Sequence, residues 1–410
     1  MRRRPGLVGF FSVSAPAVLN AVLTAVLGVL TARYLGPAGQ GALTTIVTVG
    51  AILSLVLTLG TGVSVRLRAR PVPRDEDVST FFGASIVMTL AAALLAPAIC
   101  LFFGLQDIGA TELLLTALVA ALLLVARQSS DLLQAYGRAG RSILFLAIGV
   151  LFQCLLFTFA VATGHATLRA ALICAAAGAA VQTVLGAWDI FDQPTPRPAL
   201  SWPAVRGLVR LGVPAVGYNV SLLVVQRLDR LVIVGVLGPA AGGVYAVAAT
   251  MAEASRITSS AVGQLLFVQT AAAGAVTSTS RRTYRLALAV QGALAVVGWV
   301  LAPYAIPLLF GDAYADAVPL ARLLLVAELF MGLALMDARF LMGLHRVPVV
   351  AYVTVALVVF AVPAYLVLVH TAALPGAVRA SFMLYVVYAG VLLAARRRAE
   401  RKVNNSVIPA

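Results

Sequence analysis

The chain is built from apolar segments of about 20 to 30 residues, separated by short stretches that hold arginine, glycine and proline. A bilayer has a hydrocarbon core of ~30 Å, so a helical span needs about 20 apolar residues. With 61% hydrophobic and only 11% charged residues, the chain cannot cover the surface of a water-soluble domain. The sequence therefore predicts an all-α polytopic membrane protein with about twelve transmembrane helices.

The boundaries of these spans follow from the charged runs, the Gly-Pro pairs and the proline clusters. Arg2, Arg3 and Arg4 precede the first apolar run, as in a signal peptide, but the run continues to Leu30 and is too long to be a cleaved segment. We expect spans at residues 8–31, 41–63, 81–103, 112–135, 142–163, 168–188, 209–236, 241–270, 284–309, 318–341, 347–369 and 375–395.

A short motif occurs twice and indicates an internal duplication. Residues 35–41 read LGPAGQG and residues 237–243 read LGPAAGG, so five of the seven positions are identical. Each copy joins two long apolar segments. Duplicated helical bundles in lipid are mostly transporters.

The longest polar connection, which holds four prolines, follows the sixth span and divides the chain. We expect an N-terminal six-helix lobe at 1–190, a cytoplasmic linker at 191–206, a C-terminal six-helix lobe at 207–396 and a basic tail at 397–410. Because six is an even number, the second lobe starts on the same side as the first. The two lobes are therefore expected to be parallel repeats.

The distribution of basic residues predicts the orientation. If the N-terminus is cytoplasmic, 21 of the 30 basic residues lie in cytoplasmic segments and only four lie outside: Arg33, Arg169, Arg322 and Arg379. This bias follows the positive-inside rule, and both termini are predicted to be cytoplasmic. The net charge of +15 then reflects topology and needs no nucleic-acid partner.

Two groups of residues carry a resemblance to a known family. The run Thr31-Ala32-Arg33-Tyr34-Leu35-Gly36-Pro37 is similar to the signature of the polysaccharide-biosynthesis flippases in the multidrug/oligosaccharidyl-lipid/polysaccharide (MOP) exporter superfamily. The runs 228–233, 237–239 and 244–246 resemble the pattern of that family's seventh and eighth spans. The resemblance implies two six-helix lobes around a central cavity, and transport of a lipid-linked oligosaccharide by alternating access. Peptidoglycan-precursor flippases usually carry two further helices, so that substrate is less favoured.

Polar and charged side chains inside the spans form stripes that cannot face lipid. At 100° per residue, Asn219, Gln226 and Arg230 lie within about 40° of one another on the seventh span. Similar stripes are expected on the fourth and eighth spans. The candidate substrate-binding residues are Arg230, Arg227, Asn219, Gln226, Asp229, Glu253, Arg256, Arg127 and Asp131.

The arginines of these stripes have two interpretations. Guanidinium groups could hold the diphosphate or acidic sugars of a lipid-linked glycan, since they match phosphate oxygens in a bidentate manner. Alternatively, Arg256 pairs with Glu253 at i,i+3 and Arg127 with Asp131 at i,i+4. Arg230 has no evident carboxylate on its own helix face, which makes it the first candidate for substrate contact.

Other functions are left open as alternatives. A MATE-like drug or cation exporter of the same fold is the main one, and a membrane-embedded glycan polymerase or glycosyltransferase is a distant one. No catalytic motif, metal site or cofactor is predicted, although coupling to Na⁺ or H⁺ is possible. The expected partners are the lipid-linked glycan, membrane lipid and other glycan-assembly proteins. The expected location is the bacterial plasma membrane.

Overall fold

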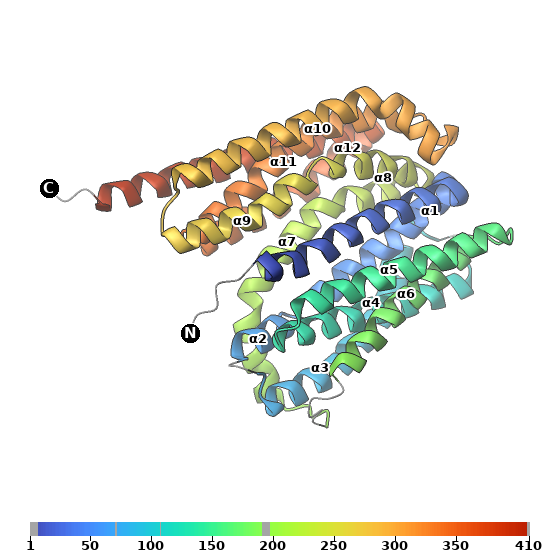
Figure 1. Ribbon diagram of the computed structural model, residues 1–410. Coiled ribbons are helices and arrows are strands. Elements are labelled where there is room, and N and C mark those ends of the chain that lie inside the picture. The colour runs from blue at the N-terminus through green and yellow to red at the C-terminus, as the bar shows by residue number, and fades with distance from the viewer. Residues whose placement is uncertain (1–6, 70–71, 107, 191–196, 408–410) are drawn as a thin grey trace. The chain divides into compact units, whose positions relative to one another are not determined.

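The computed structural model describes residues 7–69, 72–106, 108–190 and 197–407, and all regular structure in these ranges is helical (Figure 1). This confirms the predicted all-α class. Arg2 to Arg4, Arg70 and the linker residues Pro194 and Pro196 lie outside the described residues. The chain forms two compact units, residues 1–220 and 221–410.

The first unit contains six helices and the first half of a seventh. They are α1 (Leu7–Val56), α2 (Thr61–Arg68), α3 (Asp75–Phe102), α4 (Ala110–Ala135), α5 (Ala139–Ala162), α6 (Leu168–Ile190) and α7 (Trp202–Leu237). The remaining elements belong to the second unit. They are α8 (Pro239–Ala254), α9 (Ile257–Ala273), α10 (Ser278–Phe310), the short 3₁₀ helix η1 (Asp312–Tyr314), α11 (Ala317–Gly343) and α12 (Val347–Val407).

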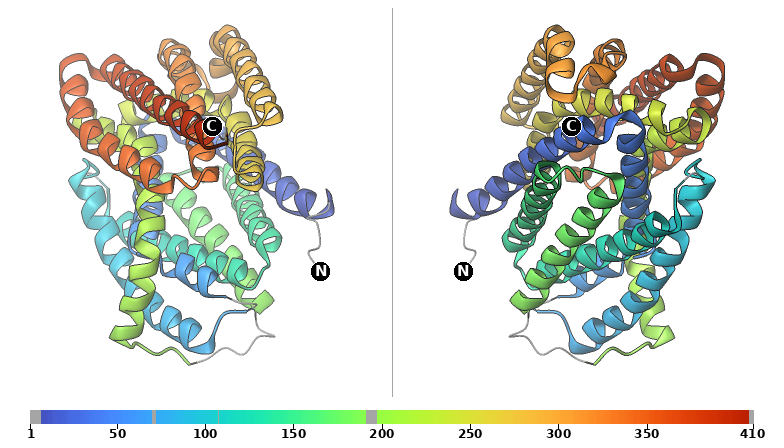
Figure 2. Two further views of the ribbon diagram at one scale, coloured as in Figure 1. Left: turned by 90° about the vertical axis from the view of Figure 1, so that its left-hand side faces the viewer. Right: turned by 90° about the vertical axis from the view of Figure 1, so that its right-hand side faces the viewer.

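The repeated motif has the same backbone conformation in both copies. Gly36 has φ 67° and ψ 178°, and Gly238 has φ 87° and ψ 170°. Only glycine adopts this region readily. The proline that follows each glycine starts the next helical segment, where its fixed φ is favourable. In α1 the two arms meet at this point in a sharp turn (Figure 2).

The structure modifies several predicted spans. α12 changes direction at Ala372 and Ala373, close to the predicted gap between 347–369 and 375–395. The predicted span 41–63 ends earlier, at Val56, and the single span predicted at 241–270 is two helices, α8 and α9. The Ser255 hydroxyl at this break donates to the carbonyl of Ala252 at 2.8 Å. Such local bonds compete with the regular helical ladder.

Eight helices in the described part of the chain are long and apolar enough to cross a membrane, namely α1, α3–α6 and α10–α12. α1 has 50 residues and α12 has 61, and each is interrupted once, so each is long enough for two crossings. α7 carries several charges, and α8 and α9 are shorter. Their sequence corresponds to the remaining two predicted spans. The chain is a multi-pass membrane protein.

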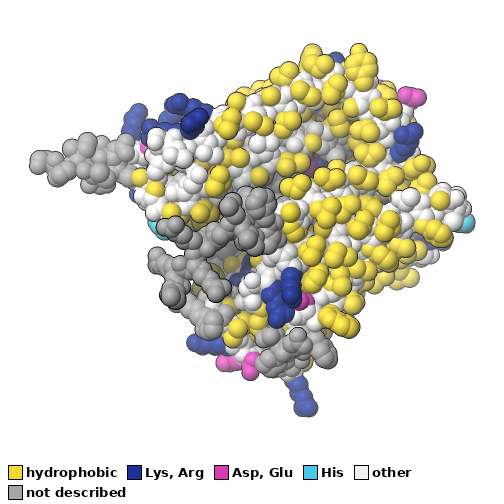
Figure 3. Space-filling model, viewed as in Figure 1, with side chains coloured by type: hydrophobic (Ala, Val, Ile, Leu, Met, Phe, Trp, Pro, Cys, Tyr) yellow, Lys and Arg dark blue, Asp and Glu magenta, His cyan; other side chains and the backbone are white. Residues whose placement is uncertain are grey.

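Close packing within each unit depends on small and apolar side chains. In the first unit, a Cβ added at Gly149 of α5 would meet the carbonyl oxygen of Gly178 of α6 at 2.6 Å, so both helices approach through glycine. In the second unit, Leu266, Met336 and Phe340 belong to one buried cluster. Hydrophobic side chains also cover much of the outer face, as expected for helices in lipid (Figure 3).

The first half of α7 packs on the first unit. Ser64 of α2 donates a hydrogen bond to the backbone carbonyl of Leu208. Gly212 of α7 approaches Gly60 so closely that a Cβ on either residue would overlap the other's backbone. The boundary between the compact units therefore lies within α7, at residues 220 and 221. The division of the chain at 191–206 stays a prediction.

Candidate functional site

The second unit brings charged residues of α7, α8 and α11 together inside the helical bundle. Arg227, Asp229 and Arg230 lie on α7, and Glu253 is on the last turn of α8. Arg256 lies at the break between α8 and α9, and Glu328 is in the middle of α11. We call this group the α7–α8–α11 cluster.

Glu253 is shared by two arginines. The Nη2 atom of Arg230 lies 2.6 Å from Oε1 of Glu253, and Nη1 of Arg227 lies 3.4 Å from the same oxygen. Sequence spacing showed no carboxylate on the helix face of Arg230 itself, and the partner that the structure provides, Glu253, comes from α8. The Arg230 side chain is only 8% exposed, whereas that of Arg227 is 30% exposed. Arg227 is the more accessible guanidinium.

Arg256 does not form the i,i+3 pair with Glu253 that was one of its two interpretations. Its Nη1 atom instead contacts both carboxylate oxygens of Glu328, at 3.1 and 2.8 Å. Both side chains are at least nine-tenths buried. Gln291 of α10 donates to the backbone carbonyl of Glu328 at 2.7 Å and accepts a hydrogen bond from Ser259. This pair therefore lies in a fully connected polar network.

Asp229 is a different kind of acid, because hydroxyl and backbone donors bind its carboxylate. The Tyr245 hydroxyl donates to Asp229 at 2.8 Å, and the backbone N–H of Arg230 donates at the same distance. Tyr245 also contacts Ser381 at 3.1 Å, and Ser381 contacts Tyr365 at 2.9 Å. No arginine of the described residues is within ion-pair distance of Asp229.

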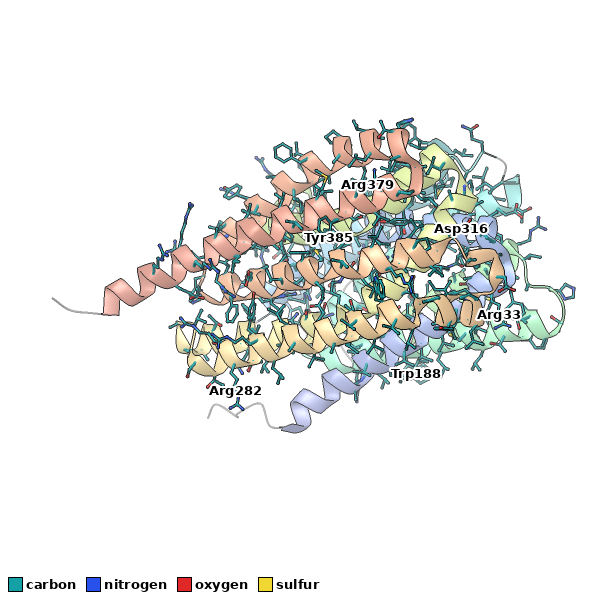
Figure 4. The ribbon with its side chains drawn as sticks, turned by 90° about the horizontal axis from the view of Figure 1, so that it is seen from above. Arg33, Trp188, Arg282, Asp316, Arg379 and Tyr385 are labelled. Carbon is teal, nitrogen blue, oxygen red and sulfur yellow. The ribbon has the colours of Figure 1, made fainter. Side chains whose placement is uncertain are left out.

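Sequence reasoning missed these hydroxyl partners. Tyr245, Ser381 and Tyr365 are buried on α8 and α12, and Tyr385 of α12 also lies within the helices of this unit (Figure 4). Buried tyrosines usually find a partner for the hydroxyl group, and this was the available signal. The contacts with α12 could not be derived from spacing along α7 and α8.

The first unit holds a smaller group around Asp131 of α4, which we call the α2–α4 cluster. Arg66 Nη2 lies 3.4 Å from Oδ1 of Asp131, and Arg127 Nε lies 3.8 Å from Oδ2. The expected i,i+4 pair of Arg127 and Asp131 is thus present. Arg66 also donates to Gln134 of α4. Arg66 lies three residues after the predicted span 41–63, so the sequence did not indicate its place in this cluster.

The two clusters share one feature within their own units. In each, two guanidinium groups approach a single carboxylate, and at least one of those arginines is partly exposed. Arg127 has 41% of its side chain exposed, compared with 8% for Asp131. A second anion could therefore bind the free edges of these guanidinium groups.

The other polar residues of the spans lie outside the two clusters. Gln226 is half-buried on the part of α7 that belongs to the second unit. Asn219 is exposed and falls in the first unit, so the expected stripe with Arg230 is divided between the units. Asp337 of α11 forms a pair with Arg396 at 2.6 Å. No group of three metal-ligating side chains occurs among the described residues.

Comparison with known proteins adds a family to this geometry. The model for polysaccharide biosynthesis proteins matches residues 30–319. The chain belongs to this family. The resemblance seen in the sequence motifs is thereby confirmed. No curated protein matches the chain significantly by sequence.

Solved structures show the fold of this family member. The lipid II flippase MurJ in an inward closed conformation has a TM-score of 0.73 and 11% identity, covering 94% of this chain and 87% of MurJ. An inward-facing multidrug resistance MATE transporter of the MOP superfamily has a TM-score of 0.69 and 16% identity, covering 95% and 96%. An outward-facing MATE transporter gives 0.65 and 16%, covering 96% of each chain. The chain therefore has the same fold as these MATE transporters and MurJ.

Proposed function

We propose that the protein is a flippase that moves a lipid-linked oligosaccharide or polysaccharide precursor across the plasma membrane by alternating access. The observation that carries this proposal is that Asp131 and Glu253 are each shared by two arginines, of which Arg127 and Arg227 are partly exposed. Charged side chains within membrane spans are costly and usually mark a functional site. Membership of the polysaccharide biosynthesis family supports a glycan-bearing substrate.

The accessible arginines are the proposed contacts for the anionic group of this substrate. Arg127 and Arg227 each share a carboxylate with a second arginine, at 3.8 and 3.4 Å, and each is partly exposed. A phosphate or acidic sugar would accept hydrogen bonds from the free edges of these two guanidinium groups, whereas Gln226 and Asn219 offer amide groups to sugar hydroxyls. Arg230 and Arg256 are proposed to have a structural role, in which they fix the positions of Glu253 and Glu328.

A MATE-like exporter of cations is the second candidate, and Asp229 is the observation that favours it. This carboxylate is 4% exposed and makes no arginine ion pair among the described residues. A cationic load or a coupling ion such as Na⁺ or H⁺ would be attracted to it. Because the family is one of polysaccharide biosynthesis, this candidate ranks below the flippase. Neither candidate requires a catalytic step or a cofactor.

Transport in proteoliposomes distinguishes the two candidates. The full-length protein is reconstituted with a fluorescent lipid-linked oligosaccharide or with a cationic dye, and movement across the bilayer is measured for each. The flippase proposal predicts movement of the lipid-linked oligosaccharide and not of the dye. Arg169→Gln removes an exposed arginine that pairs with Glu112 at 3.0 Å, outside both clusters, and should move the oligosaccharide like wild type. Transport of the dye alone would favour the exporter.

The proposed topology places both termini in the cytoplasm, with partner proteins of glycan assembly on that side. Single cysteines introduced at Ala38 and Ala240 should react with an impermeant reagent added outside intact cells. Cysteines at Arg74 and Arg281 should not react until the membrane is opened. The reverse pattern would refute this orientation and with it the bacterial inner-membrane topology proposed here.

A further inference from the structure

A basic pocket lies at the start of α10, apart from both charged clusters. It has a volume of about 390 Å³ and is lined by Val276, Ser278, Arg281, Arg282 and Arg285. Arg282 lies at this end of α10, while Asp316 follows the opposite end (Figure 4). We call it the α10 basic pocket.

The acidic groups near this pocket already have arginine partners. Glu400 of α12 lies 3.3 Å from Arg281 and 3.3 Å from Arg396. Arg396 also lies 2.6 Å from Asp337, and its guanidinium stacks over Tyr284 at 4.7 Å from the ring centre. These contacts join the ends of α10, α11 and α12. The two carboxylates that these contacts occupy, Glu400 and Asp337, are therefore already paired with Arg281 and Arg396.

Arg282 and Arg285 are exposed, and within the described part of the chain neither makes an ion pair. The contact between Arg281 and Glu400 also brings the exposed Arg397, Arg398 and Arg401 of α12 to this end of the unit. Lys and Arg side chains gather there in the space-filling view, near the point where the C-terminus leaves (Figure 3). This end of the second unit is therefore strongly positive.

An apolar face continues directly from the two unpaired arginines along α10. Leu286, Val290 and Leu294 follow at intervals of four residues and are 65%, 39% and 42% exposed. Residues four apart lie on the same face of a helix, one above the other. A ligand held by Arg282 and Arg285 would thus meet a strip of apolar surface about two turns long.

We propose that the α10 basic pocket binds an anionic phospholipid, with its phosphate on Arg282 and Arg285 and an acyl chain along Leu286, Val290 and Leu294. Guanidinium groups bind phosphate oxygens in a bidentate manner. Basic pockets beside transmembrane helices are suited to anionic headgroups. The apolar strip favours a lipid over free phosphate, which offers nothing to cover it. This proposal does not depend on the identity of the transported substrate.

Native mass spectrometry and thermal unfolding of the full-length protein test this site. The probes are phosphatidylglycerol, phosphatidylcholine and inorganic phosphate. Wild type should retain bound phosphatidylglycerol and be stabilised by it, with little effect of the other two. The double variant R282Q/R285Q should bind phosphatidylglycerol roughly 30-fold more weakly, because two interfacial arginines are lost. R282K/R285K, which keeps the charge, should retain part of the binding.

The matched control is R206Q/R210Q, which removes two exposed arginines of α7 that have no ion pair among the described residues. It should bind phosphatidylglycerol like wild type. Equal loss in both double variants would overturn the proposal, since it would show diffuse attraction to charge. Equal stabilisation by inorganic phosphate would also overturn it, since the site would then recognise a free anion. Thermal unfolding in phosphatidylcholine alone shows whether each variant is folded before phosphatidylglycerol is added.

Discussion

Both units contain a cluster of arginines and carboxylates, but the side chains of the two clusters are buried to different degrees. In the α2–α4 cluster, Asp131 faces Arg66 and Arg127, whose side chains are 30% and 41% exposed. In the α7–α8–α11 cluster, Arg230 and Arg256 are 8% and 10% exposed and close pairs of 2.6 and 2.8 Å. Arginines are therefore partly exposed in the cluster of the first unit, whereas most of those in the second unit are buried in ion pairs. Burial, and not residue identity, separates candidate ligand contacts from structural charges.

Breaking the Arg256–Glu328 pair should produce the largest loss of stability. Arg256→Ala leaves Glu328 buried without a counter-charge, and we expect the free energy of unfolding to fall by about 3–5 kcal/mol. Arg127→Ala in the first unit should cost less than about 1 kcal/mol, because Arg127 is partly exposed and Asp131 keeps Arg66. Denaturant unfolding in detergent, followed by tryptophan fluorescence, measures both values.

The double variant R256M/E328M sharpens this comparison. Removing both charges leaves no unpaired group, so most of the loss seen in Arg256→Ala should be recovered. A double variant as unstable as the single one would mean that the pair itself, together with Gln291, is required for packing.

The repeated glycines should show where the two units are alike. Gly36→Ala and Gly238→Ala place a Cβ on a backbone with φ of 67° and 87°, which only glycine adopts readily. Each change should lower the free energy of unfolding by about 1–3 kcal/mol. Gly28→Ala is the control, because Gly28 has no positive φ and an added Cβ would meet nothing within 4 Å. A neutral effect at one of the two motif glycines would show that the motif has different roles in the two units.

Tyr245→Phe should have a smaller effect on stability than Arg256→Ala or the changes at the motif glycines. It removes the 2.8 Å hydrogen bond to Asp229 but keeps the ring, so we expect a loss of about 1 kcal/mol. Tyr304→Phe is a suitable control, because Tyr304 is 73% exposed. If Tyr245→Phe lowered the free energy of unfolding as much as Arg256→Ala, the hydroxyl groups around Asp229 would stabilise the second unit as strongly as its buried ion pair does.

The sequence was sufficient for features that are local in the chain. The apolar segments predicted the helices, and the Leu-Gly-Pro motif predicted a break at Gly36 and at Gly238, because glycine and proline act on the backbone directly. The break at Ser255 was not predicted, since a single serine inside an apolar run is compatible with an unbroken helix.

Contacts between helices could not be predicted in the same way. Helical spacing showed that Arg230 and Glu253 lie on polar faces, but not that these faces meet. Arg256 and Glu328 are 72 residues apart. Local rules therefore favoured the nearer carboxylate, Glu253, which is occupied by Arg227 and Arg230. Arg66 was missed for a related reason, because its place near a predicted span end suggested a loop.

The central claim is that the accessible arginines bind the substrate and that the buried ones support the fold. The most direct test measures membrane abundance and glycan export in the same cells for Arg127→Gln, Arg227→Gln and Arg230→Gln. The first two variants should accumulate like wild type, with export per molecule reduced roughly 10- to 100-fold, because a charge-assisted contact is lost. Arg230→Gln should mainly reduce abundance, since it weakens the buried pair with Glu253. Normal export per molecule in Arg127→Gln and Arg227→Gln would contradict the account.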